Sequence, residues 1–463
     1  MIVMKFGGTS NENAAAMRNV IRIVQSRIDD QPLVVISAVA RATNELEQVA
    51  RTACLGNLTQ AEELVASLFR RHDSILLELI TSPERISTVK GAFSIYESEL
   101  NQLVKGLAIL KELTPRTMDA VCSYGERLSS RLIAAGLQEA GIEAVWVDAK
   151  DFMITDDGFG KAQPLMETVT ERLETVVRPM IREGKIPVTQ GFIGATRSGA
   201  YTTMGRESSD YSASIIGAAM NADLVQIWTD VDGILTADPR MVPSAKKVSH
   251  MSFGEAFELS YFGAKVLHPK TMLPMIEKRI SLQILNSKRE GGTGTMVEVD
   301  ALHENGVVKS IAHKRNLSVI TAAPHRRQGQ YVFWEAMFSV FTRHDISVSL
   351  MTTSEYRASF LVDNRSVTDS LVHELGDFGT VKVAGGKGCI SVVGEGIREN
   401  SEIISAVFKA LGEAGVCMVS FGASDSSISL VVESERIPAA LKRLHHEFFE
   451  DSSVSRIFEK VGS

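Results

Sequence analysis

The first 38 residues combine a strand, a glycine turn, a helix and a second strand, and this order restricts the possible folds more than any other feature. Ile2–Phe6 and Leu33–Ala38 are short apolar runs, which is typical of strands buried on both faces. The apolar residues between them have helical spacing: Met17, Val20, Ile21, Val24 and Ile28. Thr9 and Glu12 have capping-box spacing, so we expect the helix to begin there. A strand–helix–strand unit of this kind predicts a mostly parallel sheet.

The same pattern of short apolar runs and helical segments continues to about residue 300. Further strands are expected at Ala144–Val147, Ile186–Phe192, Leu224–Thr229 and Leu282–Leu285. Residues 57–113 are helical in character and predict a helical insertion. We therefore expect one large α/β domain over residues 1–300.

Two stretches near the C-terminus repeat each other at a constant offset of 70 residues. Residues 346–363 align with residues 416–433 without gaps, and an amphipathic helix precedes each copy. A duplicated unit of one helix and two strands predicts two small α+β modules. We expect them over residues 305–388 and 389–463, and an interlaced arrangement of the two is one alternative.

Composition excludes several classes of protein. The chain of 463 residues has 49 Lys and Arg against 56 Asp and Glu, a net charge of −7, which argues against a protein that wraps nucleic acid. No apolar run approaches the roughly 18–20 residues of a membrane span, and the start MIVMKFGG has no signal-peptide core. Four separated cysteines without a CxxC pair predict neither a zinc ribbon nor a disulfide framework. We expect a cytoplasmic protein with no nucleic-acid or membrane partner and no metal-ligand cluster.

Lys5 ends the first strand, and Gly7 and Gly8 follow it directly before the predicted helix. Glycines let a ligand approach the backbone closely, and a helix N-terminus offers unpaired N–H groups. A phosphate placed there would meet those donors and the Lys5 ammonium. The alternative is a plain turn between a strand and a helix, where glycines are common.

A second polar segment, residues 202–210, brings hydroxyls, Arg206 and Asp210 together ahead of a helix of small residues. Arg206 suits bidentate binding of a carboxylate. Ser209 or Asp210 alternatively serves only to cap the helix.

Residues 228–240 begin at the carboxyl end of a buried strand, where open α/β sheets bind ligands; the alternative is an acidic connecting loop. Lys265 follows a glycine beside apolar residues, and Glu126 follows a glycine inside a helical pattern. The sequence has no GxxxxGK[ST] and no GxSxG, which excludes a P-loop NTPase and an α/β-hydrolase.

Together these segments resemble the aspartate kinases (aspartokinases) of the amino-acid kinase superfamily, most of all the lysine-sensitive branch. The resemblance rests on six motifs in order: KFGGTS at 5–10, SAVARATN at 37–44, GERLSSRL at 125–132, TTMGRESSDYSA at 202–213, WTDVDGILTADPR at 228–240 and YFGAKVLHP at 261–269. The duplicated modules resemble the paired ACT domains of this family. The resemblance implies an αβα sandwich with a mostly parallel sheet, followed by two βαββαβ ACT domains, in a monofunctional enzyme.

The resemblance also implies the reaction. ATP would phosphorylate the side-chain carboxylate of L-aspartate to give 4-phospho-L-aspartate, the first step towards lysine, threonine and methionine. Mg²⁺ would arrive with ATP, held by phosphate and water. Catalysis would rest on Lys5 and on Asp210, which would orient Lys5. The implied ATP-binding residues are Lys5, Gly7, Gly8, Thr229, Asp230, Leu235, Arg240 and Lys265.

For aspartate, the resemblance implies that Arg206 binds the α-carboxylate and Glu126 the α-amino group. The other implied contacts are Thr43, Ser208 and Ser209. Two positions depart from the family near these sites: Glu207-Ser208 replaces the usual Gly-Gly, and Leu235 stands where Tyr is common. An acidic side chain beside an anionic substrate leaves a weakened or altered site as an alternative.

The ACT resemblance implies feedback inhibition by an end-product amino acid and association of chains through these modules into a homodimer or homotetramer. The implied effector residues are Ser347, Ser349, Thr353 and Ser354. Ser349 replaces an acidic residue of the lysine-sensitive pattern, so lysine, threonine and no inhibition all stay open. Two further readings are a kinase for another carboxylate and a non-catalytic amino-acid sensor.

Overall fold

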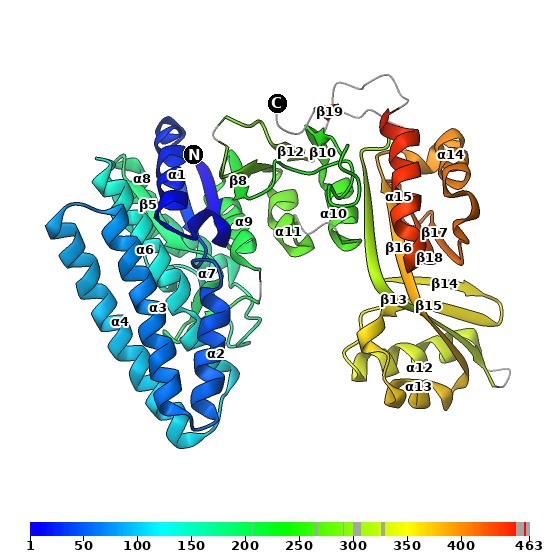
Figure 1. The fold of residues 1–463 in the computed structure, drawn as a ribbon, viewed down its shortest axis with the longest axis horizontal. Helices are drawn as coiled ribbons and strands as arrows, with labels where there is room; N and C mark the ends of the chain where they lie inside the picture. Colours follow the sequence, from blue (N-terminus) through cyan, green and yellow to red (C-terminus); the bar gives the residue numbers. More distant parts are fainter. Residues whose placement is uncertain are drawn as a thin grey trace. The chain divides into compact units, whose positions relative to one another are not determined.

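The computed structural model describes residues 1–205, 207–263, 267–289, 291–299, 307–325, 329–450 and 458–459 (Figure 1). The chain divides into two compact units, each described by itself below. The first comprises Met1–Ile234 and Leu267–Val299, and the second comprises Leu235–Val266 and Asp300–Ser463.

This division differs from the predicted one in a single segment. Residues 235–266 were expected in the domain 1–300, but they belong to the second unit. The physical reason is burial, because Ala237, Val242 and Ala245 join the apolar core of that unit. The domain limits at residues 300 and 388 stay predictions.

The first unit holds a mostly parallel sheet, as predicted. Its strands run in the order β12-β11-β8-β1-β2-β5-β3, and the neighbouring pairs are parallel except β11 with β12. Their bounds are β1 (Ile2–Phe6), β2 (Leu33–Ile36), β3 (Ala144–Trp146), β5 (Ile186–Gln190), β8 (Leu224–Thr229), β11 (Ser281–Asn286) and β12 (Thr295–Glu298). A small second sheet joins β4 (Ile154–Thr155), β6 (Ile193–Thr196) and β7 (Tyr201–Thr203).

Two strands end earlier than predicted because their last residues have other backbone roles. Leu33–Ala38 was expected, but β2 stops at Ile36 and the Ala38 N–H donates to a side chain. Ile186–Phe192 was expected, but Phe192 has a left-handed φ of 66°, so β5 stops at Gln190.

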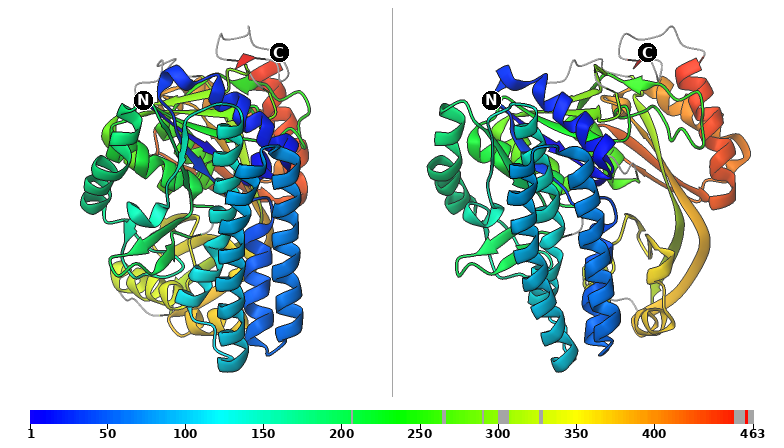
Figure 2. Two further views of the ribbon diagram at one scale, coloured as in Figure 1. Left: turned by 90° about the vertical axis from the view of Figure 1, so that its left-hand side faces the viewer. Right: turned by 60° about the vertical axis from the view of Figure 1, so that its left-hand side comes forward.

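Helices cover this sheet in an αβα arrangement. The helix α6 packs on β2, β3 and β5, and α9 packs on β1, β2 and β8, while α1 lies against α6 and α11 against α9. The helices of this unit are α1 (Ala14–Gln25), α2 (Ala42–Cys54), α3 (Leu58–Leu79), α4 (Pro83–Leu110), α5 (Pro115–Cys122), α6 (Tyr124–Glu139), α7 (Met166–Arg172), α8 (Arg178–Arg182), α9 (Ser209–Met220) and α11 (Pro269–Lys278). The two long helices α3 and α4 lie side by side in the segment expected to be a helical insertion (Figure 2).

The start of α1 corrects the predicted capping box. Residues Gly8–Asn11 form a 3₁₀ turn, and α1 begins at Ala14 with Asn13 as its cap, whose side-chain oxygen accepts from the Ala16 N–H at 2.9 Å. The helix also ends at Gln25, so the predicted apolar residue Ile28 lies beyond it and is 42% exposed.

The second unit holds one sheet of both modules, in the order β14-β15-β13-β16-β18-β17. The strands and helices of this unit are β9 (Lys247–Val248), β10 (His250–Ser252), α10 (Phe253–Tyr261), β13 (Ser310–Pro324), α12 (Gln330–Arg343), β14 (Leu350–Ser354), β15 (Arg357–Asp363), α13 (Asp369–Gly376), β16 (Gly379–Val393), α14 (Ser401–Leu411), β17 (Met418–Phe421), β18 (Ser427–Glu433), α15 (Ile437–His445) and β19 (Phe458–Glu459). The hairpins β14–β15 and β17–β18 lie at the predicted offset of 70 residues, because β15 and β18 span 357–363 and 427–433.

The two long strands β13 and β16 each serve both modules. Ser310–Lys314 pair with Cys389–Val393, whereas Leu317–Pro324 pair with Gly379–Lys387 after an irregularity in the register. Side chains separate in the same way: Ile311 lies in one apolar core and Ile320 in another. One module is therefore inserted between the first strand segment and the remainder of the other.

Candidate active site

The carboxyl ends of β1, β2 and β8 meet at one edge of the parallel sheet. The Gly7 N–H donates to the Trp228 oxygen at 3.1 Å, and the Ser37 N–H donates to the Phe6 oxygen at 3.1 Å. A Cβ on Gly8 would lie 3.2 Å from the Ala38 oxygen, so this turn needs a glycine for close packing. This edge is where open α/β sheets bind ligands.

Alternation along β1 brings Lys5 to Asp210. Met4 and Phe6 lie in the core that α1 and α6 share, so the intervening Lys5 faces the opposite side, where α9 packs. The Lys5 ammonium lies 2.6 Å from a carboxylate oxygen of Asp210 in the first turn of α9, and Lys5 is only 8% exposed. Asp210 therefore pairs with a cation, and Ser208 occupies the N-cap without a side-chain hydrogen bond, so neither Ser209 nor Asp210 caps the helix.

Polar residues missed by the sequence analysis hold this edge together. The Asn11 amide donates to the Gly7 oxygen at 3.0 Å and to the Ser37 oxygen at 3.3 Å. Ser287 accepts from the Ser10 hydroxyl at 2.7 Å and donates to the Thr229 oxygen at 3.0 Å.

Glu126 lies buried in α6, with 3% of its surface exposed. One carboxyl oxygen accepts from the Ala38 N–H at 3.1 Å, and the other has no partner among the described residues. Burial raises the pKa of Glu126 to about 8. Thr43, in the first turn of α2, follows the same loop and is half-buried.

The loop before α9 is tightly packed. Ser208 and Ser209 are buried, and the Ser208 hydroxyl has no partner among the described residues. A Cβ on Gly191 would lie 2.6 Å from the Ser209 Cβ, so the glycine permits the contact. Glu207, where the resembling family has glycine, adopts a left-handed φ of 61°.

Asp119 of α5 anchors the strand that leads into this loop, and no motif singled it out. Its carboxylate accepts from the Thr203 N–H at 2.8 Å, the Thr203 hydroxyl at 2.7 Å and the Gly160 N–H at 2.8 Å. Burial raises its pKa, while the three hydrogen bonds oppose that rise.

The predicted nucleotide residues are divided between the units. Thr229 and the exposed Asp230 end β8 in the first unit. Leu235 and Arg240 belong to the second, where Leu235 packs on the apolar core and Arg240 forms an ion pair with Asp238 at 2.7 Å. Two further predictions, Arg206 and Lys265, lie outside the described residues.

The predicted effector residues lie around the start of β14 in the second unit. Ser347, Thr353 and Ser354 are exposed, while Ser349 is half-buried and its N–H donates to the Leu361 oxygen at 2.7 Å.

Two searches of the described residues found nothing. No cluster of three or more His, Cys, Asp or Glu side chains with the arrangement of a metal site occurs in them. No helix in this part of the chain has the length and apolar character needed to cross a membrane.

Comparisons with known proteins agree with this geometry. Residues 1–286 match the amino acid kinase family and residues 390–448 match the ACT domain. The chain is 36% identical to aspartokinase 2, chloroplastic, of Arabidopsis thaliana, over 97% of this chain and 84% of that protein. It is 32% identical to lysine-sensitive aspartokinase 3 of Escherichia coli K12, over 97% of this chain and 99% of that protein.

A solved structure shares the fold over nearly the whole chain. E. coli aspartokinase III in complex with aspartate and ADP superimposes with a TM-score of 0.83 and 31% identity, covering 97% of this chain and 100% of that one. The chain therefore belongs to the amino acid kinase family and carries an ACT domain. Within that family it is an aspartokinase, which confirms the predicted resemblance and the predicted αβα and ACT architecture.

Proposed function

We propose that Lys5 and Asp210 form the catalytic centre of this aspartokinase. The observation that carries the proposal is their 2.6 Å ion pair, buried at the carboxyl edge of the parallel sheet beside Gly7 and Gly8. A side-chain carboxylate of aspartate is already deprotonated near neutral pH, so its attack on the γ-phosphorus of ATP needs no general base. The transfer needs positioning and neutralised charge, which a fixed ammonium and nearby N–H groups supply as the bond to ADP breaks. Asp210 would keep Lys5 oriented.

For ATP, the proposed contacts in the first unit are the Gly7–Gly8 backbone, Thr229 and Asp230, because β8 lies directly beside β1. Leu235, Arg240 and Lys265 are proposed to complete the nucleotide site. Mg²⁺ would be held mainly by phosphate oxygens and water, which fits the lack of a metal-ligand cluster in the described residues. When bound it would neutralise phosphate charge.

For aspartate, we propose that Glu126 binds the α-amino group and Arg206 the α-carboxylate, with Thr43, Ser208 and Ser209 nearby. The support from the geometry is the free oxygen of Glu126 and the free hydroxyl of Ser208, since neither has a partner among the described residues. Buried polar atoms without partners are rare and suit a site that a ligand completes.

ADP release with Mg-ATP and L-aspartate tests the catalytic proposal. Lys5→Ala should lower kcat by at least about 100-fold, the loss typical of a removed transition-state contact. Lys105→Ala is the matched control, because Lys105 is a lysine with 58% of its side chain exposed on α4. Its activity should equal that of the wild type.

Removing only one partner of a buried ion pair also destabilises a fold. The double variant Lys5→Met/Asp210→Asn removes both charges, so it should melt near the wild type and still be inactive. A folded single or double variant with wild-type kcat would rule out the proposed centre.

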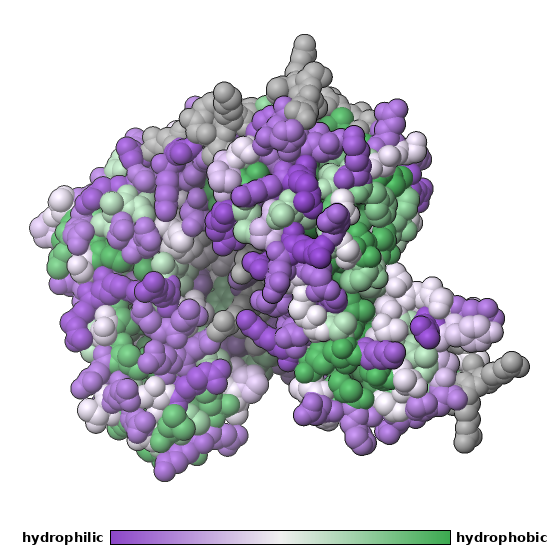
Figure 3. All heavy atoms as spheres, turned by 45° about the vertical axis from the view of Figure 1, so that its right-hand side comes forward, coloured by the Kyte–Doolittle hydropathy of each residue, from purple (hydrophilic) through white to green (hydrophobic). Residues whose placement is uncertain are grey.

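We also propose that an end-product amino acid, lysine or threonine, inhibits the enzyme and that chains associate through the ACT modules. The support is the ACT match and the exposed apolar side chains of the second unit: Tyr331, Val332, Phe338 and Tyr356. Figure 3 shows one face on which hydrophobic residues gather in patches among hydrophilic ones. Light scattering with and without each amino acid measures the assembly. The cytoplasmic location stays a prediction, which cell fractionation tests.

A further inference from the structure

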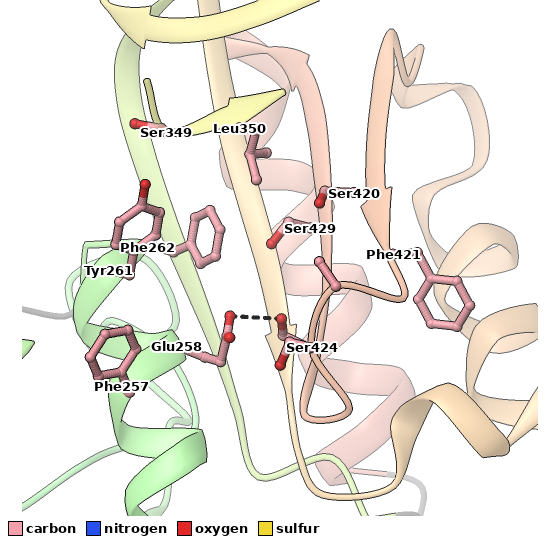
Figure 4. A pocket seen from close by; sticks show the side chains of 12 residues that line it. Phe257, Glu258, Tyr261, Phe262, Ser349, Leu350, Ser420, Phe421, Ser424 and Ser429 are labelled. Atoms are coloured by element: carbon pink, nitrogen blue, oxygen red, sulfur yellow. Dashed lines mark hydrogen bonds between the residues drawn. The ribbon is translucent and has the colours of Figure 1, made fainter. Parts of the chain in front are cut away.

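A cavity of about 210 Å³ lies in the second unit, away from the predicted effector residues Ser347, Thr353 and Ser354, none of which lines it. One wall is α10, and the other is formed by the edge strands β14 and β17 and the start of β18 (Figure 4). Leu350 and Ser420, which are equivalent positions of the 70-residue repeat, both line it. The cavity therefore lies where the equivalent edge strands of the two modules meet α10.

The charge of this cavity is one-sided. Glu258 of α10 points toward the opposite wall, where its carboxylate accepts from the Ser427 hydroxyl at 2.8 Å (Figure 4). Among the described residues, no Lys, Arg or His forms an ion pair with Glu258, and the lining includes no cationic side chain. A partly enclosed carboxylate without a counter-charge favours binding of a cation.

The other lining groups also suit an organic cation. The remaining polar side chains are serine hydroxyls, which donate and accept equally well, including Ser349 and Ser420. Phe262 and Tyr261 supply aromatic rings, and such rings attract ammonium groups. The Tyr261 hydroxyl donates to the Val348 oxygen at 3.2 Å and so fixes α10 to the residues just before β14.

We propose that this cavity is a second small-molecule site, which takes a primary ammonium compound of amino-acid size. Glu258 binds the ammonium group, and the serine hydroxyls bind the rest of the ligand. The volume fits this class, because pockets for drug-sized ligands run from roughly 300 to 1,000 Å³. The site does not depend on the proposed catalytic residues.

Isothermal titration calorimetry on the full chain tests the proposal with L-lysine, L-threonine and cadaverine, an amine without a carboxylate. At least one probe should bind the wild type, and Glu258→Gln should weaken that binding about tenfold or more, the loss expected for one charge-assisted hydrogen bond. Glu435→Gln is the matched control, because Glu435 is exposed and does not line the cavity. Thr353→Val separates the predicted effector site, and it should leave this binding unchanged.

Ser420→Leu gives a second, independent variant, since it fills the cavity and leaves Glu258 in place. It should weaken the same probe at least about tenfold as well. Melting temperature and elution volume establish that each variant is folded. The proposal is overturned if none of the three probes binds the wild type, if folded Glu258→Gln or Ser420→Leu binds like the wild type, or if Thr353→Val removes all binding.

Discussion

Single residues decide the chemistry of the candidate active site through their depth and their partners. Lys5 is in place because alternate positions of β1 face opposite sides of the sheet, which a short apolar run already predicts. Asn11 and Asp119 could not be predicted, because one Asn in a turn and one Asp in a helix carry no periodic signal. Their importance comes from backbone groups that only the folded chain brings to them.

The pKa of Glu126 predicts a pH-dependent affinity for aspartate. Its pKa is raised to about 8, so the carboxyl group is mostly protonated below that pH and ionised above it. If Glu126 binds the α-amino group as proposed, KM for aspartate should fall as the pH rises through about 8, measured at saturating Mg-ATP. Glu126→Gln should raise KM and remove this step. An unchanged pH profile in the variant would assign the titration to another group.

The left-handed backbone of Glu207 predicts a stabilising substitution. A side chain at φ 61° costs about 1–2 kcal/mol, whereas glycine there costs about 0.5–1 kcal/mol in chain entropy. Glu207→Gly should therefore raise the melting temperature by about 1–3 °C. Glu207→Ala keeps the Cβ and should not raise it. A lower melting temperature for Glu207→Gly would show that the carboxylate itself stabilises the loop.

At the scale of helices and strands, the sequence predicted which elements form better than where they end. Strand β8 begins and ends at the predicted residues, and the helical insertion contains α3 and α4. The start of α1 was wrong because Thr9 and Asn13 both suit a cap, and local spacing alone does not choose between them.

The helix α3 contains a buried histidine that makes stability depend on pH. His72 is fully buried, contacts the Leu68 oxygen at 2.8 Å and lies edge-on to Phe93 of α4, and its pKa is lowered to about 4 by burial. The unfolded chain binds a proton on this group near pH 6.5 and the folded chain near pH 4, so stability falls as the pH drops between them.

Over that range the wild type should lose up to about 3 kcal/mol relative to His72→Leu, which cannot be protonated there. Denaturant unfolding at several pH values measures the difference between the two proteins. Parallel pH profiles would show that His72 does not titrate in this range.

At the scale of the whole molecule, the repeat could be predicted because it is written in the sequence at a fixed offset. The membership of residues 235–266 in the second unit could not be, because it depends on packing without a period. A buried ion pair secures that segment: Lys309 lies 2.9 Å from Glu255 of α10, and the two side chains are 1% and 0% exposed.

Lys309→Met should therefore destabilise the second unit by about 3–5 kcal/mol, because it leaves a buried carboxylate without its partner. Lys309→Met/Glu255→Gln should recover most of this loss, as followed by the melting temperature. Lys387→Met is the control, since its partner Glu433 is half exposed, and it should cost at most about 1 kcal/mol. A wild-type melting temperature for Lys309→Met would mean that the pair adds no stability.

The shared strands β13 and β16 also set an order of events during synthesis. Ser310–Lys314 leave the ribosome first, but their partners Cys389–Val393 follow only after the inserted module. At about 5–20 residues per second, that module can close its sheet while the outer one still waits. Until then the start of β13 is an unpaired apolar strand, open to pairing with another nascent chain. The connectivity of this sheet thus makes the inner module the one that folds first.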